Sequence, residues 1–168
     1  MVSDRELKES MRPPRSGTRI VGRVRILLAH DMSSACDSLA SSIESAMGDV
    51  EIIDVSSVDA GRATLHSMKL SVCFICLDLP PAPQGAVRLA TEAIRVGAPF
   101  VLVTRSLRWL PASATTLHDV PWVPPDATPA AVTTAVLAAT GATILRTVGR
   151  VSEPPGVVVP LRVAGRSR

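Results

Sequence analysis

The sequence predicts a doubly wound α/β domain, in which helices cover both faces of a parallel sheet. Short runs rich in Val, Ile and Leu alternate repeatedly with longer segments of helical periodicity. Hydrophobic residues make up 46% of the 168 residues and aromatic residues only 2%, so the core must be aliphatic. An aliphatic core is typical of parallel strands that are buried on both faces. The length suits one domain with additional ends.

The domain is expected to cover residues 23–141. Residues 1–22 are polar, basic and interrupted by prolines, which predicts a disordered basic arm. Residues 142–168 are predicted to be a basic tail with a short apolar segment at Val157–Val163. The charge distribution follows this division, because residues 26–126 carry six basic and eleven acidic side chains, while both ends are basic.

The first strand is predicted at residues 24–29, an apolar run rich in residues that favour strands. Ser33 or Ser34 is the candidate N-cap of the helix that follows, whose apolar residues keep helical spacing. Gly48 is expected to end that helix, since glycine tolerates the left-handed conformation common at helix C-termini.

The same pattern then occurs twice more. Residues 50–55 predict a second strand and residues 57–70 a second helix. Residues 71–77 predict a third strand, which a proline-rich loop separates from a helix at residues 84–96 that ends at Gly97. The inward positions expected on this third helix are Val87, Ala90, Ala93 and Ile94.

The last strands and helices are less regular. Residues 100–104 predict the fourth strand, residues 107–117 a poorly specified fourth helix, and residues 120–123 a short fifth strand. Thr128 followed by Pro129 is a typical helix start, so a fifth helix is expected over residues 130–140.

Pro121 favours a particular strand order. Proline cannot donate a hydrogen bond to a neighbouring strand, so it is tolerated mainly in edge strands. The flavodoxin-like order 2-1-3-4-5 makes strands two and five the edges, and right-handed crossovers then place helices on both faces.

Polar residues follow three of the predicted strands. His30 and Asp31 follow the first, Asp78 the third and Thr104 the fourth. In doubly wound sheets functional groups gather at the carboxyl ends of the strands, so these residues predict an acidic pocket.

The arrangement resembles the receiver domain of response regulators in bacterial two-component systems, over roughly 115 residues. His30-Asp31 matches the family's acidic pair, Asp78 in the run Leu77 to Pro81 matches the phosphoaccepting aspartate, and Thr104 matches the Ser or Thr that ends the family's fourth strand. The resemblance implies a signal-transduction protein with Asp78 as the candidate phosphoacceptor. The lack of a membrane-spanning run or signal peptide predicts a cytoplasmic protein, and the lack of standard catalytic motifs predicts that it is not an enzyme.

Several residues depart from the family's pattern, which indicates an atypical receiver or pseudo-receiver. His30 replaces a carboxylate of the magnesium pair, so Asp31 and Asp78 are expected to bind Mg²⁺ weakly, and no other cofactor is expected. The family's phosphate-pairing lysine has no counterpart between Trp122 and Pro125, and Gly85 comes one position early. These departures weaken the expectation that Asp78 is phosphorylated.

An atypical receiver would regulate by binding a protein partner or a second copy of itself. Receivers commonly use the face formed by helix 4, strand 5 and helix 5, and the exposed candidates here are Arg105, Arg108, Trp109 and Trp122. Alternatively, the two tryptophans pack against the sheet edge.

Two other functions stay open. One is a flavodoxin-like domain that binds a small molecule over Asp31, Asp78 and Thr104. The other is a DNA-associated regulator that uses its basic arms, which is less favoured because no aromatic platform or helix-turn-helix accompanies them.

No apolar run is long enough to cross a membrane, and no Gly-rich phosphate loop or nucleophile elbow occurs. Cys73 and Cys76 are predicted to point to opposite faces of a strand, which argues against a redox pair.

Overall fold

The computed structural model describes residues 23–31 and 35–141. The predictions for residues 1–22, for the caps Ser33 and Ser34, and for residues 142–168 lie outside these described residues. One parallel sheet has the order β2-β1-β3-β4-β5, which confirms the predicted order. Its strands are β1 (Val24–Ala29), β2 (Val50–Val55), β3 (Val72–Cys76), β4 (Phe100–Val103) and β5 (Trp122–Val123).

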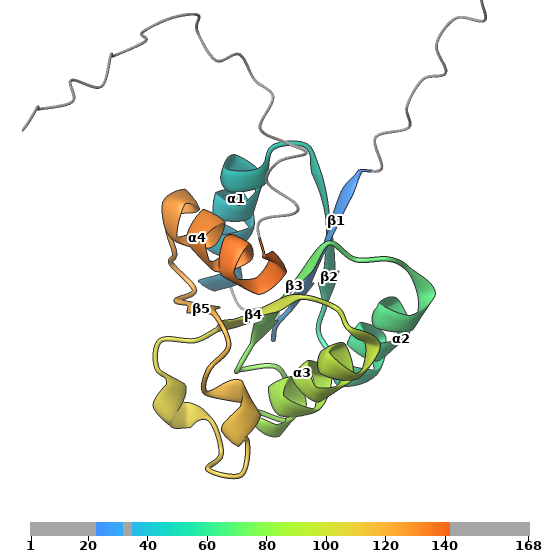
Figure 1. Cartoon of the computed structure of the whole chain (residues 1–168), viewed down its shortest axis with the longest axis vertical. Helices are drawn as coiled ribbons and strands as arrows, with labels where there is room; N and C mark the ends of the chain where they lie inside the picture. The colour runs from blue at the N-terminus through green and yellow to red at the C-terminus, as the bar shows by residue number, and fades with distance from the viewer. Residues whose placement is uncertain (1–22, 32–34, 142–168) are drawn as a thin grey trace, which may run out of the picture.

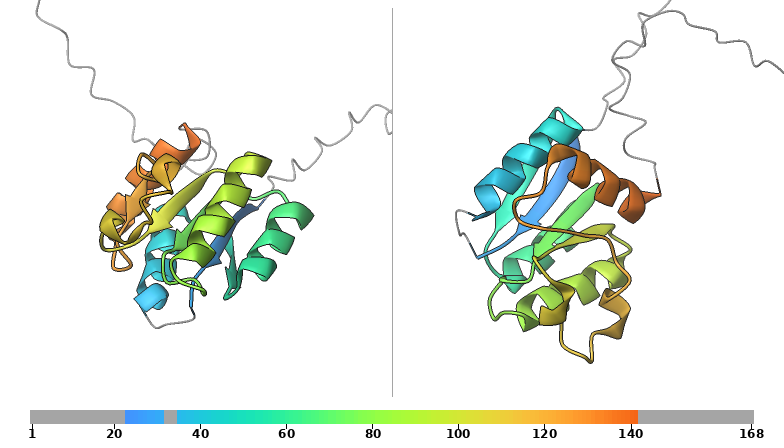
Figure 2. Two further views of the ribbon diagram at one scale, coloured as in Figure 1. Left: turned by 90° about the horizontal axis from the view of Figure 1, so that it is seen from below. Right: turned by 90° about the vertical axis from the view of Figure 1, so that its left-hand side faces the viewer.

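The helices form a layer on each face of this sheet (Figures 1 and 2). Helices α1 (Ala35–Met47) and α4 (Pro129–Thr140) pack against each other on one face. Helices α2 (Val58–Ser67) and α3 (Gln84–Val96) pack against each other on the opposite face. The predicted doubly wound fold class is therefore confirmed.

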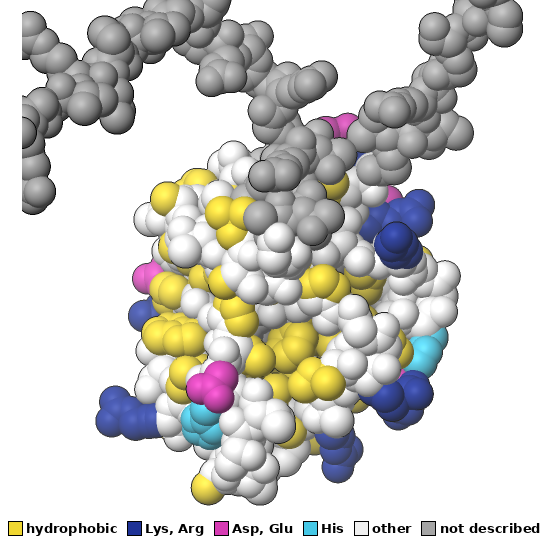
Figure 3. Space-filling view, viewed as in Figure 1, with side chains coloured by type: hydrophobic (Ala, Val, Ile, Leu, Met, Phe, Trp, Pro, Cys, Tyr) yellow, Lys and Arg dark blue, Asp and Glu magenta, His cyan; other side chains and the backbone are white. Residues whose placement is uncertain are grey.

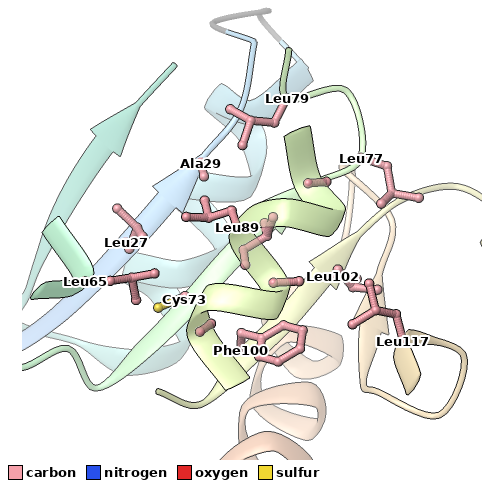
Figure 4. Packing of buried hydrophobic residues seen from close by; sticks show 14 of the residues in the cluster. Leu27, Ala29, Leu65, Cys73, Leu77, Leu79, Leu89, Phe100, Leu102 and Leu117 are labelled. Carbon is pink, nitrogen blue, oxygen red and sulfur yellow. The ribbon is translucent and has the colours of Figure 1, made fainter. Parts of the chain in front are cut away.

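Alternation along the buried strands divides the core between the two layers. Leu27 and Ala29 of β1 face α2 and α3, whereas Ile26 and Leu28 face α1 and α4. Figure 4 shows Leu27, Ala29 and Leu89 in the first of these clusters. Successive residues of a strand point to opposite faces, so each central strand supplies apolar side chains to both layers.

The helix boundaries follow from local signals. Ser57 caps α2, because its hydroxyl oxygen accepts a hydrogen bond from the backbone N–H of Ala60 at 3.2 Å. Thr128 caps α4 in the same way, as its sequence predicted. Gly48 and Gly97 have φ of 77° and 71° after α1 and α3, the left-handed conformation expected where these helices end.

The predicted helix over residues 107–117 is wrong. Two short 3₁₀ turns, η1 (Leu107–Trp109) and η2 (Thr115–Leu117), stand in its place, so the described residues form four α-helices. Pro111 lies between the turns and cannot donate the backbone hydrogen bond that a continuous helix requires. Three apolar residues of this connection are nevertheless buried in the α2–α3 layer: Leu110, Ala114 and Leu117.

The buried face of α3 differs from the prediction. Ile94 of α3 is 51% exposed, while Glu92, a polar residue, occupies a buried position on that helix.

Strand β5 has only two residues and begins after Pro121, whose carbonyl still accepts a hydrogen bond from the N–H of Leu102 at 2.9 Å. β5 is an edge strand, as the position of the proline predicted.

Candidate functional site

The strand register brings the predicted polar residues to one edge of the sheet. Ala29 pairs with Val55 on one side and with Ile75 on the other, and Cys76 pairs with Val103. The residues that follow these strands therefore emerge together, with His30 and Asp31 between the ends of β2 and β3. This edge is the candidate site.

His30 is buried and directed towards β2. Its Nε2 atom lies 3.2 Å from Oδ1 of Asp54, and its backbone N–H donates to the carbonyl of Val55 at 3.0 Å. The sequence prediction did not include Asp54. Only the register of β1 against β2, which pairs Leu28 with Asp54, places this carboxylate within reach of the histidine.

Asp31 and Asp78 are both exposed on this edge, and their charges interact. The pKa of Asp78 is raised, first because neighbouring protein removes water from its carboxylate and second because of the negative charge of Asp31. A hydrogen bond with its own backbone and the nearby His30 partly oppose this increase. The negative charge on Asp78 is therefore less favourable than on an ordinary surface aspartate.

Thr104 is buried at the end of β4, and its hydroxyl takes part in a local turn. Its hydroxyl donates to the carbonyl of Ser106 at 3.0 Å and accepts from the N–H of Ser106 at 3.1 Å. The same hydroxyl therefore both donates and accepts within two residues of its own chain. If this pair of hydrogen bonds broke, the N–H and the carbonyl of Ser106 would both need other hydrogen-bond partners.

The residues present form an incomplete magnesium site. Mg²⁺ prefers octahedral oxygen ligation, and the described side chains at this edge offer two carboxylates, from Asp31 and Asp78. His30 carries nitrogen donors, and one of them contacts Asp54. Within residues 23–31 and 35–141, no group of three His, Cys, Asp or Glu side chains is placed to hold a metal ion.

A separate open groove of about 500 Å³ lies between α2 and α3. The residues that line it include Arg62 and Arg88 from the two helices, and Pro80 and Pro81 from the loop after Asp78. Because two helices and a loop build this groove together, no local sequence signal indicated it.

The predicted partner residues lie beside β5 and on the connection that precedes it. Arg105, Arg108 and Trp109 are exposed there, with Trp109 70% exposed, and Trp122 of β5 is 43% exposed. In Figure 3, hydrophobic side chains gather on the surface over β5 and this connection, while basic side chains lie mainly at the margin of the view. None of the helices in the described part of the chain combines the length and apolar character needed to cross a membrane.

Comparison with known proteins finds similarity at the level of structure. No protein-family model and no curated protein matches the sequence. The response regulator receiver protein from Sinorhizobium medicae WSM419 is 20% identical, with a TM-score of 0.57 over 73% of this chain and 98% of that chain. A CheY-like receiver domain from Methylobacillus flagellatus is 18% identical, with a TM-score of 0.51 over 66% of this chain and 92% of that one.

A third similar structure is the signal receiver domain of a modulated diguanylate cyclase from Desulfovibrio desulfuricans G20. It is 13% identical, with a TM-score of 0.58 over 71% of this chain and 94% of that chain. The chain therefore has the fold of a response-regulator receiver domain, as the resemblance in its sequence predicted.

Proposed function

We propose that this chain is an atypical receiver, which acts in signal transduction or transcriptional regulation by binding a protein partner without phosphorylation of Asp78. The receiver fold supports the signalling role. The details of the strand ends support the absence of a phosphorylation switch.

The hydrogen bonding of Thr104 is the observation that carries this proposal. In the receiver family, the residue at this position is a Ser or Thr at the end of the fourth strand. Here the Thr104 hydroxyl already both donates to and accepts from Ser106. Turning it towards a group on Asp78 would break both bonds, and each costs roughly 1 kcal/mol to lose.

The charges at the strand ends support the same conclusion. A phosphoryl group on Asp78 would add negative charge beside Asp31, where the pKa of Asp78 is already raised. The residues Trp122 to Pro125, where the family carries its lysine, include no basic side chain to offset that charge. Asp31 and Asp78 would bind Mg²⁺ weakly, because the carboxylate of Asp54 contacts His30 and the hydroxyl of Thr104 is bonded to Ser106.

The exposed residues beside β5 form the proposed partner surface, which consists of Arg105, Arg108, Trp109 and Trp122. Tryptophan and arginine are enriched among the residues that carry binding energy in protein interfaces. The partner is another protein or a second copy of this chain. Since the expected fourth helix is absent, this surface is built from η1, β5 and the adjoining loops.

The test is treatment of the full chain with acetyl phosphate and Mg²⁺, followed by intact-mass measurement. We expect no gain of a phosphoryl group in the wild-type protein, because Trp122 to Pro125 provide no lysine to pair with it and the hydroxyl of Thr104 is bonded to Ser106. A phosphoryl gain that Asp78→Asn abolishes, and that Asp119→Asn leaves unchanged, would overturn the proposal. Asp119 is the matched control because it is also an exposed aspartate.

A further inference from the structure

Two cysteines that are distant in the sequence lie in contact beside the candidate site. Cys36 is in the first turn of α1 and Cys76 is the last residue of β3. Their Sγ atoms are 3.5 Å apart, and each residue is 2% exposed. No spacing in the sequence indicated this contact, because it depends on α1 packing over the end of β3.

We propose that Cys36 and Cys76 are an oxidisable pair, which a peroxide converts into an intramolecular disulfide. This modification site is additional to the proposed binding function and does not depend on it. The third cysteine, Cys73, is excluded from the pair by its position.

The sheet separates Cys73 from the other two thiols. Cys73 lies in the core between the sheet and α2–α3, whereas Cys36 and Cys76 lie in the core between the sheet and α1–α4. The prediction that Cys73 and Cys76 face opposite sides of β3 is thus confirmed. Burial raises the pKa of Cys73 to about 12, and the contact with Cys36 together with burial raises the pKa of Cys76 as well, so position and not acidity distinguishes Cys73 from the pair.

The movement that the disulfide requires is small. A disulfide has an S–S distance of about 2.05 Å, so the two sulfur atoms must approach by roughly 1.5 Å. Cys36 can supply this movement more easily than Cys76. The first turn of a helix has backbone N–H groups without partners within the helix, whereas β3 is held by strands on both sides.

The reaction balances with hydrogen peroxide as the oxidant. One sulfur, as thiolate, attacks a peroxide oxygen; the O–O bond breaks, and a sulfenic acid and one water result. The second thiol then attacks the sulfenic sulfur, forming the S–S bond while the S–O bond breaks and the oxygen leaves as a second water. Each sulfur loses one electron, and the two thiol protons are released into the water products.

The disulfide would connect the start of α1 to the end of β3, two residues before Asp78. It would therefore restrain one wall of the acidic edge that Asp31 and Asp78 share. Since both thiols are buried, a peroxide can reach them only when the first turn of α1 opens, and the reaction should be slow compared with that of an exposed thiol.

The experiment oxidises the folded, full chain with hydrogen peroxide, then unfolds it, alkylates the remaining thiols and digests it with trypsin. We expect a loss of two hydrogen atoms, one alkylated cysteine in place of three, and a cross-link between the tryptic peptides 26–62 and 70–88. Cys73→Ala should keep this cross-link, although both Cys73 and Cys76 lie in the second peptide. Cys76→Ala and Cys36→Ala should lose it.

Three results would overturn the proposal. They are three alkylated cysteines after oxidation of the wild-type chain, a cross-link that disappears in Cys73→Ala, and a cross-link that forms between chains instead of within one. Oxidation of the chain in urea is the control for geometry. Once the sheet no longer separates the thiols, we expect pairs that include Cys73, and the same single pair in urea would also contradict the proposal.

Discussion

Asp78 differs from an ordinary surface aspartate because partial removal of water by neighbouring protein, and then the charge of Asp31, raise its pKa. The folded protein therefore holds a proton on this carboxyl more readily than the unfolded chain does. The contribution of Asp78 to stability is therefore greatest below its ordinary pKa of 3.8 and falls as the pH rises through the raised pKa. We therefore expect the charged form of Asp78 to be unfavourable for folding at neutral pH.

We accordingly predict that Asp78→Asn is more stable than the wild type at pH 7, and that the gain disappears near pH 3. Urea unfolding at both pH values measures the difference in the free energy of unfolding. Asp119→Asn, at another exposed aspartate, should show no comparable gain. A loss of stability at pH 7 in Asp78→Asn would show that the carboxylate is a net stabilising group.

Glu92 shows the opposite electrostatic effect. It connects α2 to α3, because its carboxylate contacts His66 and accepts hydrogen bonds from Nε and Nη2 of Arg95. Arg95 and His66 lower its pKa to about 2. The stability that this carboxylate contributes is present above its ordinary pKa of 4.5 and is lost as the pH falls towards 2.

Glu92→Gln should therefore be less stable than the wild type at pH 6, and this difference should shrink between pH 4.5 and 2. Urea unfolding across this range is the measurement. Glu44→Gln, at an exposed position of α1, is the matched control and should retain the wild-type pH dependence. An unchanged pH dependence in Glu92→Gln would contradict the assigned role of this carboxylate.

The residues of the acidic edge were predictable because strand ends determine them. A polar residue directly after a buried apolar run must emerge at the edge of the sheet, so Asp31, Asp78 and Thr104 could be identified without a structure. Asp54 and Cys36 could not, since their contacts depend on the register of β2 and on the packing of α1. Glu92 was missed because helical periodicity identifies apolar positions and not a buried ion pair.

At the scale of elements, the start of α3 depends on a glycine. A Cβ atom at Gly85 would lie 2.4 Å from the carbonyl oxygen of Leu79 and 2.6 Å from that of Pro80. Both contacts are with backbone, which cannot move aside without displacing the loop after Asp78. A Cβ atom at Gly61 of α2 would instead meet the end of the Leu89 side chain at 2.8 Å.

We predict that Gly85→Ala lowers the free energy of unfolding by about 1–3 kcal/mol, the usual cost of overpacking. Gly61→Ala should cost less, because a side chain can adjust and alanine favours the helix by about 1 kcal/mol. Urea unfolding of both variants checks the order. If Gly61→Ala lowered the free energy of unfolding as much as Gly85→Ala or more, the backbone of the loop after Asp78 would have to move easily.

The connection between β4 and β5 shows the limit of predicting elements from the sequence. Helix α4, which the sequence predicted as a fifth helix, was predictable from Thr128 and Pro129, which determine where it starts. The segment 107–117 has apolar residues at helical spacing, yet Pro111 interrupts it and the tertiary core still takes up its apolar side chains. Burial therefore does not distinguish a helix from two turns here.

This connection allows a direct test of the exposed tryptophan. We predict that Trp109→Ala changes the free energy of unfolding by less than about 0.5 kcal/mol, as expected at an exposed surface position. Leu117→Ala, which removes a buried side chain of the same connection, should cost about 2–5 kcal/mol. A cost of several kcal/mol for Trp109→Ala would assign this tryptophan to packing and remove it from the partner surface.

At the scale of the whole molecule, the fold is that of a receiver, and we propose that the phosphorylation switch is absent. The alternation of aliphatic strands and helices is enough to produce a receiver fold at 13–20% identity to the solved receivers compared above. The residues at the strand ends are only partly those of the family, and the hydroxyl of Thr104 is committed to Ser106. The proposed function therefore depends on the receiver fold and its exposed surface, and not on a response to phosphate.

The most direct test of this account is the backbone amide NMR spectrum of the full chain with beryllofluoride and Mg²⁺, which imitate the phosphorylated aspartate. We predict that the amide signals of Thr104, Ser106 and Trp122 stay unchanged, because the hydroxyl of Thr104 keeps its two bonds to Ser106. Shifts of these three signals in the wild type, absent in Asp78→Asn, would contradict the account and establish a working phosphorylation switch.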